Sequence, residues 1–248
     1  MNKPVVALIP SRLASRRLPG KALLNICGLP MIVHVAKRTQ LSSLVDEVYV
    51  CTDSDQIHSV CVKHNIPVLL TSSEHTNGTE RIASVAGRFP GSVIIDVQGD
   101  EPLIQPDNID TVVEFTMNCE FIPEIVLPSI PSLYDSADSV IRVLSSISGR
   151  VMYLSRSSLP FPFKSRPQFM NKHLSTICFS PGSLERYISF PRSYFESIED
   201  IELLRAIEND MSVFSLQISG NSHSVDILDD VAKVEFAMTN DSLLHQYI

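Results

Sequence analysis

Short apolar runs alternate with amphipathic stretches through the first 130 residues. The apolar runs are typical of strands buried on both faces, and the stretches between them repeat apolar residues at helical spacing. Strands and helices in this order predict a parallel sheet covered on both faces. The expected strands are residues 5–9, 45–52, 68–70, 93–97 and 125–130, and the expected helices are residues 31–41, 55–65, 79–86 and 106–117.

The pattern changes after about residue 140, where shorter apolar runs predict an antiparallel or mixed layer. The expected fold is a single α/β domain with a mostly parallel, doubly wound, Rossmann-like sheet and a smaller mixed α+β lobe. Residues 1–135 form the first lobe and residues 136–223 the second, and residues 224–248 return to the first. In the second part we expect strands at 140–144, 151–154, 174–179 and 213–218, helices at 181–188, 197–210 and 228–238, and a proline-rich lid or interface loop at 159–172.

The composition fits a folded protein and excludes several classes. Hydrophobic residues make up 44% of the 248 residues and charged residues 19%, which is too apolar for a disordered chain. The formal net charge of −8 argues against nucleic acid as a partner. The five cysteines form no CxxC pair and are interpreted as small buried hydrophobes. The chain shows no signal-peptide pattern and no membrane-length apolar run, so we expect a cytoplasmic protein without membrane insertion.

A cluster of positive charge follows the first expected strand. Ligands of parallel sheets bind at the carboxyl ends of the strands, which is where this cluster lies. Gly20 would let the backbone approach a phosphate closely, and arginine forks pair with phosphate oxygens. The spacing matches neither a dinucleotide-binding fingerprint nor a P-loop, so it predicts another kind of polyanion site, with a solvated basic loop as the alternative. The four cations are Arg12, Arg16, Arg17 and Lys21.

An acidic loop follows the fourth expected strand. Gly99 allows a sharp turn directly before Asp100, and a carboxylate at a strand end suits a hard cation such as Mg²⁺. The cation would bridge phosphate oxygens and neutralise charge while a phosphoryl bond breaks. The same residues would serve equally well as a turn and a helix cap. Asp226 follows a short β-like run near the C-terminus and is expected to end a strand.

Several motifs occur in a regular order along the chain. They are residues 9–12 (Ile-Pro-Ser-Arg) with 15–21, residues 28–35, Thr52-Asp53, residues 78–81 (Gly-Thr-Glu-Arg), residues 97–102 (Val-Gln-Gly-Asp-Glu-Pro), Ser155-Arg156 with Pro160, and Val225-Asp226 with Asp229-Asp230. Together they resemble the cytidylyltransferases that activate 3-deoxy-manno-octulosonate (Kdo), the CMP-Kdo synthetases, over essentially the whole length. The resemblance implies a nucleotidyltransferase fold.

The resemblance implies transfer of CMP from CTP to the anomeric hydroxyl of Kdo or a closely related ulosonic acid, with release of pyrophosphate. It implies that Lys21, Arg17 and Asp100 are catalytic, and that Asp100 and Asp226 bind Mg²⁺. Positioning, together with cations against the triphosphate, would supply most of the rate acceleration. It also implies a homodimer formed through the second lobe and a place in lipopolysaccharide biosynthesis.

The resemblance divides the binding residues between two substrates. The first lobe would bind the nucleotide and the second the sugar acid, with Arg156 a natural partner for the sugar carboxylate. A histidine packed in the core is the other interpretation of His173. The nucleotide-binding set is Arg12, Ser15, Arg17, Lys21, Gly78, Thr79, Glu80, Arg81 and Gln98, and the sugar-binding set is Arg156, His173 and Glu202.

The sugar half departs from the family pattern at three positions. Ser175 and Ile177 stand where the family has glycine and tyrosine after the histidine, and Leu203 replaces a glutamine. Each lost contact would leave a sugar hydroxyl unsatisfied, at a cost of about 1–3 kcal/mol. Two alternatives therefore stay open. One is a CMP-synthetase for a sialic-acid-like or amino-substituted sugar acid, and the other is a catalytically inactive nucleotide-binding relative.

Overall fold

The computed structural model describes residues 3–15, 17–119, 121–133, 137, 139–165, 167–220 and 223–248. Arg16 and parts of the proline-rich segment and of the expected turn near residue 220 lie outside these residues. The main-sheet strands are β1 (Val5–Ser11), β4 (Glu47–Thr52), β5 (Val68–Leu70), β6 (Val93–Val97), β7 (Ile125–Leu133), β8 (Arg142–Ser145), β9 (Val151–Ser155), β10 (Phe169–His173), β11 (Thr176–Phe179) and β12 (Val213–Gln217); β2 (Asn25–Ile26) and β3 (Leu29–Pro30) form a separate hairpin.

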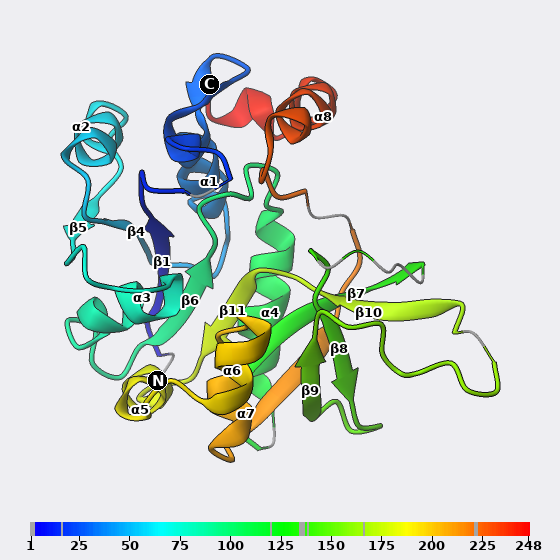
Figure 1. The fold of residues 1–248 in the computed structure, drawn as a ribbon. Coiled ribbons are helices and arrows are strands. Elements are labelled where there is room, and N and C mark those ends of the chain that lie inside the picture. The colour runs from blue at the N-terminus through cyan, green and yellow to red at the C-terminus, as the bar shows by residue number, and fades with distance from the viewer. Residues whose placement is uncertain are drawn as a thin grey trace.

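The ten main strands form one sheet in the order β5-β4-β1-β6-β11-β7-β10-β8-β9, with β12 beside β7 (Figure 1). Pairings among β5, β4, β1 and β6 are parallel, as the alternation of strands and helices predicts. From β11 onward the pairings are antiparallel, except for the parallel pair of β7 and β12. The predicted α/β fold class is therefore confirmed, and the second half continues the same sheet.

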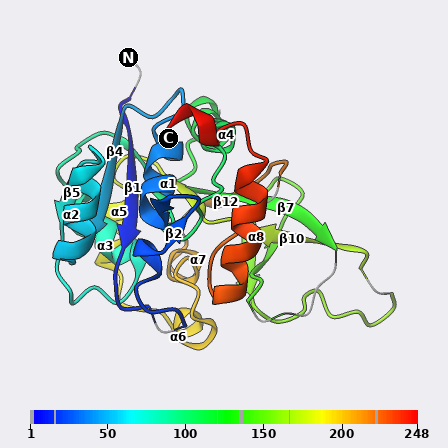
Figure 2. The same ribbon diagram turned by 90° about the horizontal axis from the view of Figure 1, so that it is seen from above.

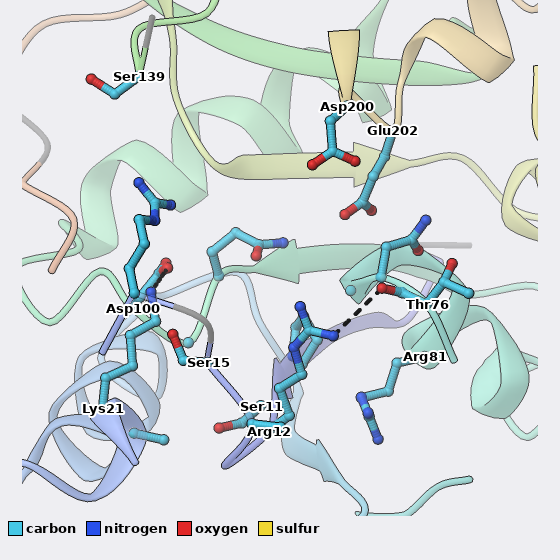
Figure 3. A pocket seen from close by; sticks show the side chains of 18 of the residues that line it. Ser11, Arg12, Ser15, Lys21, Thr76, Arg81, Asp100, Ser139, Asp200 and Glu202 are labelled. Atoms are coloured by element: carbon cyan, nitrogen blue, oxygen red, sulfur yellow. Dashed lines mark hydrogen bonds and ion pairs between the residues drawn. The ribbon is translucent and has the colours of Figure 1, made fainter. Parts of the chain in front are cut away.

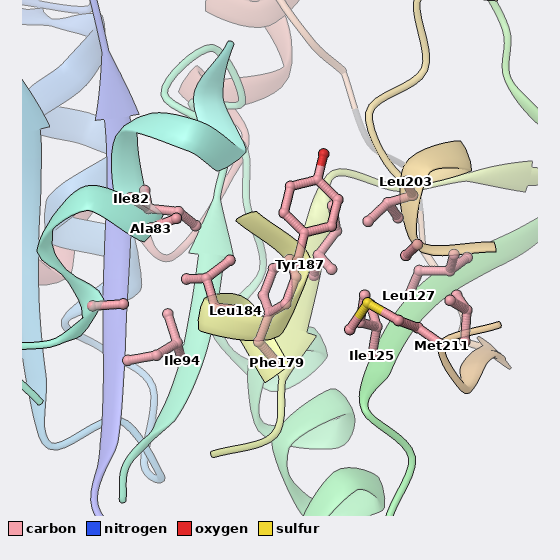
Figure 4. Packing of buried hydrophobic residues seen from close by; sticks show 14 of the residues in the cluster. Ile82, Ala83, Ile94, Ile125, Leu127, Phe179, Leu184, Tyr187, Leu203 and Met211 are labelled. Atoms are coloured by element: carbon pink, nitrogen blue, oxygen red, sulfur yellow. The ribbon is translucent and has the colours of Figure 1, made fainter. Parts of the chain in front are cut away.

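Helices cover both faces of the sheet. Alternate residues of β1 supply the two cores: Val6 and Leu8 face one side, and Ala7 and Ile9 face the other. The first side is packed by α3, α5 and α7, whose contacts around Tyr187 are drawn in Figure 4, and the second by α1, α2 and α4. The helices are α1 (Met31–Thr39), α2 (Asp55–Lys63), α3 (Gly78–Ala86), α4 (Pro106–Asn118), α5 (Ser183–Ser189), α6 (Tyr194–Glu199), α7 (Leu204–Glu208) and α8 (Leu228–Thr239), with short 3-10 turns η1 (Lys21–Leu23) and η2 (Leu244–Gln246).

Three expected elements of the second half differ from the structure. The single helix expected at residues 197–210 is wrong: α6 ends at Asp200, whose φ of 52° is left-handed, and α7 begins four residues later. The strand expected at 174–179 is shorter, because β10 pairs with β7 and β8 whereas β11 pairs with β6 and β7. Asp226 does not end a strand; it lies in irregular chain before α8.

The C-terminal segment lies beside the β2–β3 hairpin of the first half of the chain, where α8 contacts β2 (Figure 2). The Arg38 side chain, which is fully buried, donates to Asp241 Oδ2 (2.6 Å) and to the Tyr247 hydroxyl (3.1 Å). His34 Nδ1 lies 2.9 Å from the same hydroxyl. These contacts, which we call the C-terminal anchor, fix α8 and with it the residues just before it.

Candidate functional site

A cavity of about 960 Å³ opens at the carboxyl ends of β1 and β6 (Figure 3). Its lining comes from residues 10–22, 76–81 and 98–100 of the first half and from residues 139–202 of the second half. Ligand pockets usually measure about 300–1,000 Å³, so this cavity has room for a nucleotide and a second ligand. The site thus lies where strand ends of the parallel half face the antiparallel half.

The basic loop forms one side of the cavity. Arg12, Arg17 and Lys21 of the predicted cationic cluster line it, together with Ser15, which the resemblance assigns to the nucleotide. Gly20 adopts a φ of 72°, which is left-handed and favours glycine, and the chain then enters η1 with Lys21 as its first residue. All four side chains are hydrogen-bond donors on one loop. The three that are charged provide the positive field that a triphosphate requires.

Lys21 joins the two predicted metal-binding aspartates. Its Nζ lies 2.6 Å from Asp100 Oδ2 and 3.3 Å from Asp226 Oδ1, and it donates to the Val225 carbonyl at 3.1 Å. Arg17 Nη2 lies 2.9 Å from the same Asp226 oxygen. Residues from three distant parts of the sequence therefore meet at one point: Asp226 does not itself line the cavity, but it contacts two residues that do, Arg17 and Lys21.

Gly99 fixes where the acidic loop sits. A Cβ atom added at this residue would lie 2.8 Å from the Pro10 carbonyl oxygen, a separation that side chains do not tolerate. The acidic loop therefore presses against the end of β1. The Val225 amide donates to the Asp100 carbonyl (2.9 Å), which ties the C-terminal segment to the same loop.

The donor set at this point suits Mg²⁺. Two carboxylates and a main-chain carbonyl converge on Lys21, and all three are hard oxygen donors. Magnesium in phosphoryl-transfer sites is commonly held by one or two carboxylates, with waters and substrate phosphates as its other ligands. Among the described residues no group of three or more potential metal-binding side chains occurs, so a metal here would have two protein carboxylates as its side-chain ligands.

The second side of the cavity is the start of α3, which we call the α3 wall (Thr76, Asn77, Gly78 and Arg81). The Asn77 side chain caps the helix by accepting from the Glu80 amide at 2.8 Å. Arg81 is buried and lies 3.3 Å from Asp53. Thr79 and Glu80 do not line the cavity: Thr79 is buried, and the Glu80 carboxylate turns toward α7.

Two carboxyl groups lie at the cavity floor: Asp96 is buried beneath it, and Glu202 is partly buried and lines the cavity. Both oxygens of Asp96 accept from Gln98 Nε2, at 3.0 and 3.1 Å, so the Gln98 amide nitrogen is held inward. Burial, aided by the charge of Glu202, raises the pKa of Asp96 well above its usual value. Burial also raises the pKa of Glu202, against the opposing hydrogen bond from Thr79. This floor favours neutral carboxyl groups.

The third side comes from α6 and the start of α7, and we call it the α6–α7 wall (Glu196, Asp200 and Glu202). Glu202 Oε2 accepts from the Thr79 amide at 2.9 Å, which joins this wall to α3. Arg156 also lines the cavity, and its guanidinium donates to the carbonyls of Glu199 (2.8 Å) and Asp200 (3.1 Å). Arg156 and Glu202 thus lie in the second half of the cavity, where the resemblance places the sugar acid.

His173 is the predicted sugar-binding residue that does not line the cavity. It ends β10, and its Nε2 is inaccessible to solvent and has no hydrogen-bond partner among the described residues. Burial lowers the pKa of this imidazole to about 4. The geometry fits a neutral histidine within the sheet, so its role toward a sugar stays a prediction.

Several lining residues were not anticipated from the sequence, among them Ser139, Arg192, Glu196 and Asp200. Ser139 lies in an irregular segment that carries no motif, and Asp200 is the left-handed residue that ends α6. Arg192 Nη2 lies 3.1 Å from Asp200 Oδ1, and it stands between a proline and a serine that precede α6. The Pro-x-Ser helix-start signal could have placed Arg192 at a helix N-terminus, although not at the cavity.

The family model for cytidylyltransferases matches residues 6–213, which span all three sides of the cavity. The chain belongs to the cytidylyltransferase family. Membership confirms the predicted family resemblance and the predicted enzyme class, a nucleotidyltransferase. The matched residues include the basic loop, the acidic loop and α3, whereas Asp226 lies beyond them.

Individual cytidylyltransferases are similar to the chain along nearly its whole length. The 3-deoxy-manno-octulosonate cytidylyltransferase of Geobacter sulfurreducens is 36% identical over 243 residues, covering 93% of this chain and 97% of the relative. The enzyme of the same name from Pelobacter propionicus is 35% identical and covers 92% and 95% of the two chains. The similarity therefore extends through both halves of the cavity.

A solved cytidylyltransferase structure has the same fold. The structure of CMP:2-keto-3-deoxy-manno-octonic acid synthetase complexed with CTP superposes with a TM-score of 0.89 at 27% identity, covering 96% of this chain and 99% of that chain.

In the described part of our cytidylyltransferase, no helix combines the length and apolar character needed to cross a bilayer.

Proposed function

We propose that the protein transfers CMP from CTP to the anomeric hydroxyl of Kdo, releasing pyrophosphate. The observation that carries the proposal is the meeting of Lys21, Asp100 and Asp226 at one end of a cavity whose other end holds Arg156 and Glu202. The names of the relatives and of the CTP complex supply the identity of the substrates.

In this reaction the anomeric oxygen attacks the α-phosphorus of CTP in line. The new oxygen–phosphorus bond forms as the bond between the α-phosphorus and the bridging oxygen to pyrophosphate breaks, and the hydroxyl proton passes to water. Arg12, Arg17 and Lys21 bind triphosphate oxygens and stabilise the charge that grows on pyrophosphate. The side chains act by position and charge, with no covalent intermediate on the protein.

We propose Mg²⁺ as the cofactor, held by Asp100 and Asp226. Bound there, it would offset negative charge on the phosphates. Lys21 then remains beside both carboxylates and keeps them oriented toward the cavity. The Val225 main chain, hydrogen-bonded to Asp100, holds the two carboxylates at a fixed separation.

We place the sugar acid between Arg156 and the α6–α7 wall. Its carboxylate pairs with Arg156, which lines the cavity and is held by main-chain carbonyls at the end of α6. Glu202 faces its hydroxyls from the floor, and Arg192 provides a second cation at the cavity margin.

The first test replaces one aspartate. We expect Asp100→Asn to reduce pyrophosphate release from CTP and Kdo at least about 100-fold, because a metal-binding charge is lost where negative charge develops. The matched control is Asp229→Asn, an exposed aspartate three residues beyond Asp226, which should stay within about twofold of wild type. Chelation by EDTA should stop the wild-type enzyme. Near-normal turnover in Asp100→Asn, with an unchanged circular dichroism spectrum, would remove Asp100 from its role.

A panel of sugar acids separates Kdo from the alternatives. Wild-type protein is assayed for CMP-sugar formation with Kdo, its 8-amino analogue and N-acetylneuraminate under identical conditions. Preference for Kdo supports the proposal, and preference for either other acid reassigns the sugar. CTP binding without turnover of any acid would favour the nucleotide-binding relative.

We further propose a homodimer that forms through the second half of the sheet. Large apolar side chains are exposed on β7, on β10 and on the segment before β10. Phe169 of β10 pairs with Leu133 of β7, and Phe161 and Phe163 lie in the segment before β10. An apolar surface of this kind is unusual for a monomer and fits a self-associating face. Sedimentation equilibrium of the wild type and of Phe169→Lys checks it, with a monomeric variant expected.

We propose the cytoplasm as the working compartment. All five cysteines are free thiols, and Cys51, Cys61 and Cys178 are buried. Disulfides are rare in the cytosol, where thiols are kept reduced. Fractionation of cells that produce the protein would test the assignment.

A further inference from the structure

One arginine behind the cavity joins the α3 wall to the α6–α7 wall. Arg205 lies on α7 and is almost completely buried. Its Nη2 is 2.8 Å from Glu80 Oε1 and 2.7 Å from Glu196 Oε1, and its Nε donates to Glu196 Oε2 at 2.8 Å. The pair with Glu196 is therefore bidentate, while the same guanidinium reaches across to α3.

Each carboxylate holds a different wall. Glu80 Oε2 accepts from both the amide (3.1 Å) and the hydroxyl (2.7 Å) of Thr76, a lining residue of the α3 wall. Glu196 is itself a lining residue of the α6–α7 wall. Burial alone would raise the pKa of Glu80, but hydrogen bonds from Arg205 and Thr76 outweigh it and lower that pKa. Glu80 is thus a charged link between Arg205 and Thr76.

A second chain of contacts runs in parallel. The Arg205 guanidinium stacks over the Tyr187 ring at 4.8 Å, and the Tyr187 hydroxyl donates to the Glu202 carbonyl at 3.0 Å. The Glu202 side chain in turn accepts from the Thr79 amide at the start of α3. Both chains begin at Arg205; one ends at Thr76 just before α3 and the other at Thr79 in its first turn.

The chemistry of arginine suits this position. A guanidinium is planar, stays charged and presents several donors in fixed directions, so it can serve two carboxylates and a ring at once. Lysine has a single ammonium group and cannot occupy the Nε and Nη2 positions together. Without the guanidinium, Glu80 and Glu196 would face each other with uncompensated charge in a partly buried place.

We propose that Arg205 is a positioning residue, which sets the spacing between the α3 wall and the α6–α7 wall and so the separation of the two substrates. This inference rests on the proposed function, in which the nucleotide and the sugar acid lie against those walls. A displacement of about 1 Å between reacting groups can lower a rate about 100-fold. Arg205 therefore controls turnover without touching either substrate.

The test compares Arg205→Lys and Arg205→Gln with a matched control, Arg186→Gln. Arg186 also pairs with a glutamate, Glu124, and lies over a ring, Phe190, but it stands outside the cavity. We expect both Arg205 variants to lower kcat at least about tenfold and to change the Kd for CTP less than about threefold. Arg186→Gln should match wild type in both. An Arg205→Lys variant with wild-type kcat would overturn the proposal.

Hydrogen exchange gives a readout that does not need turnover. In the Arg205 variants, without substrate, amides in residues 71–82 should exchange at least about fivefold faster, because Glu80 and Glu202, the acceptors of the Thr76 and Thr79 amides, lose their connections to Arg205. Glu80→Gln, which alters a half-buried side chain and spares α7, should speed exchange of the Thr76 amide and leave that of Thr79 closer to wild type. Unchanged amide exchange rates in folded variants would refute the proposed role of Arg205 in setting the spacing of the two walls. If wild type turned over no sugar acid, the proposed function would fail, and the exchange result would still decide the role of Arg205.

Discussion

At the scale of single residues, the site depends on positions where one added atom matters. Gly99 is such a position, because its backbone lies against the Pro10 carbonyl and leaves no room for a side chain. The constraint is steric, and it concerns the residue that directly precedes Asp100. A small change at Gly99 is therefore transmitted to the proposed metal-binding carboxylate.

We expect Gly99→Ala to lower kcat at least about tenfold and to destabilise the fold by about 1–3 kcal/mol, because the new Cβ forces the acidic loop away from β1. Pyrophosphate release and urea unfolding measure the two effects. Gly87→Ala is the control: Gly87 has a φ of −60° and nothing within 4 Å of an added Cβ. It should keep full activity and gain about 0.4–1 kcal/mol. Equal behaviour of the two variants would contradict the steric argument.

The imidazole of His173 predicts how the stability of the fold depends on pH. Its folded-state pKa of about 4 lies below the ordinary value of 6.5, so the unfolded chain binds this proton first as the pH falls. Stability from the neutral imidazole is present above pH 6.5 and is lost as the pH falls toward 4, by up to about 3 kcal/mol. His173→Gln should remove this part of the pH dependence, as urea unfolding at pH 7 and pH 4.5 can show. His245→Gln, at an exposed histidine, should follow wild type.

At the scale of elements, the local pattern was sufficient for the strands and the helix cap of the parallel half. The apolar runs at β1, β5 and β6 and the Ser54 cap of α2 were predictable, because burial and capping act within a few residues. The basic and acidic loops were predictable for a related reason, since strand ends of a parallel sheet meet at one edge. The half of the site that comes from α6 and α7 had no comparable rule.

The break between α6 and α7 shows why. Residues 197–210 have helical spacing, but Asp200 turns left-handed and Glu202 points to the cavity floor, where it accepts from Thr79. That contact spans 123 residues of sequence. The order of β10 and β11 is likewise set by pairing with distant strands. Non-local partners, which one sequence does not reveal, therefore decided these elements and hid Arg192 and Asp200 from prediction.

At the scale of the whole molecule, the C-terminal anchor connects the end of the chain to the site. We expect Tyr247→Phe to cost about 1–3 kcal/mol, because buried Arg38 Nε loses its acceptor, and to lower kcat as α8 and Asp226 loosen together. Urea unfolding and pyrophosphate release measure both. Tyr49→Phe removes a hydroxyl that donates to Glu47 at the surface and should change neither. Loss of stability without loss of kcat would separate the anchor from Asp226.

The return of the C-terminal segment also bears on how the protein is made. The basic loop, the acidic loop and α3 precede Asp226, Asp241 and Tyr247 in the sequence and are therefore synthesised before them. Domains begin to fold from the N-terminus during synthesis. A nascent or prematurely terminated chain can therefore form most of the sheet and still lack a complete active centre. The proposed metal site is therefore complete only after Asp226 and the segment that follows it have been synthesised.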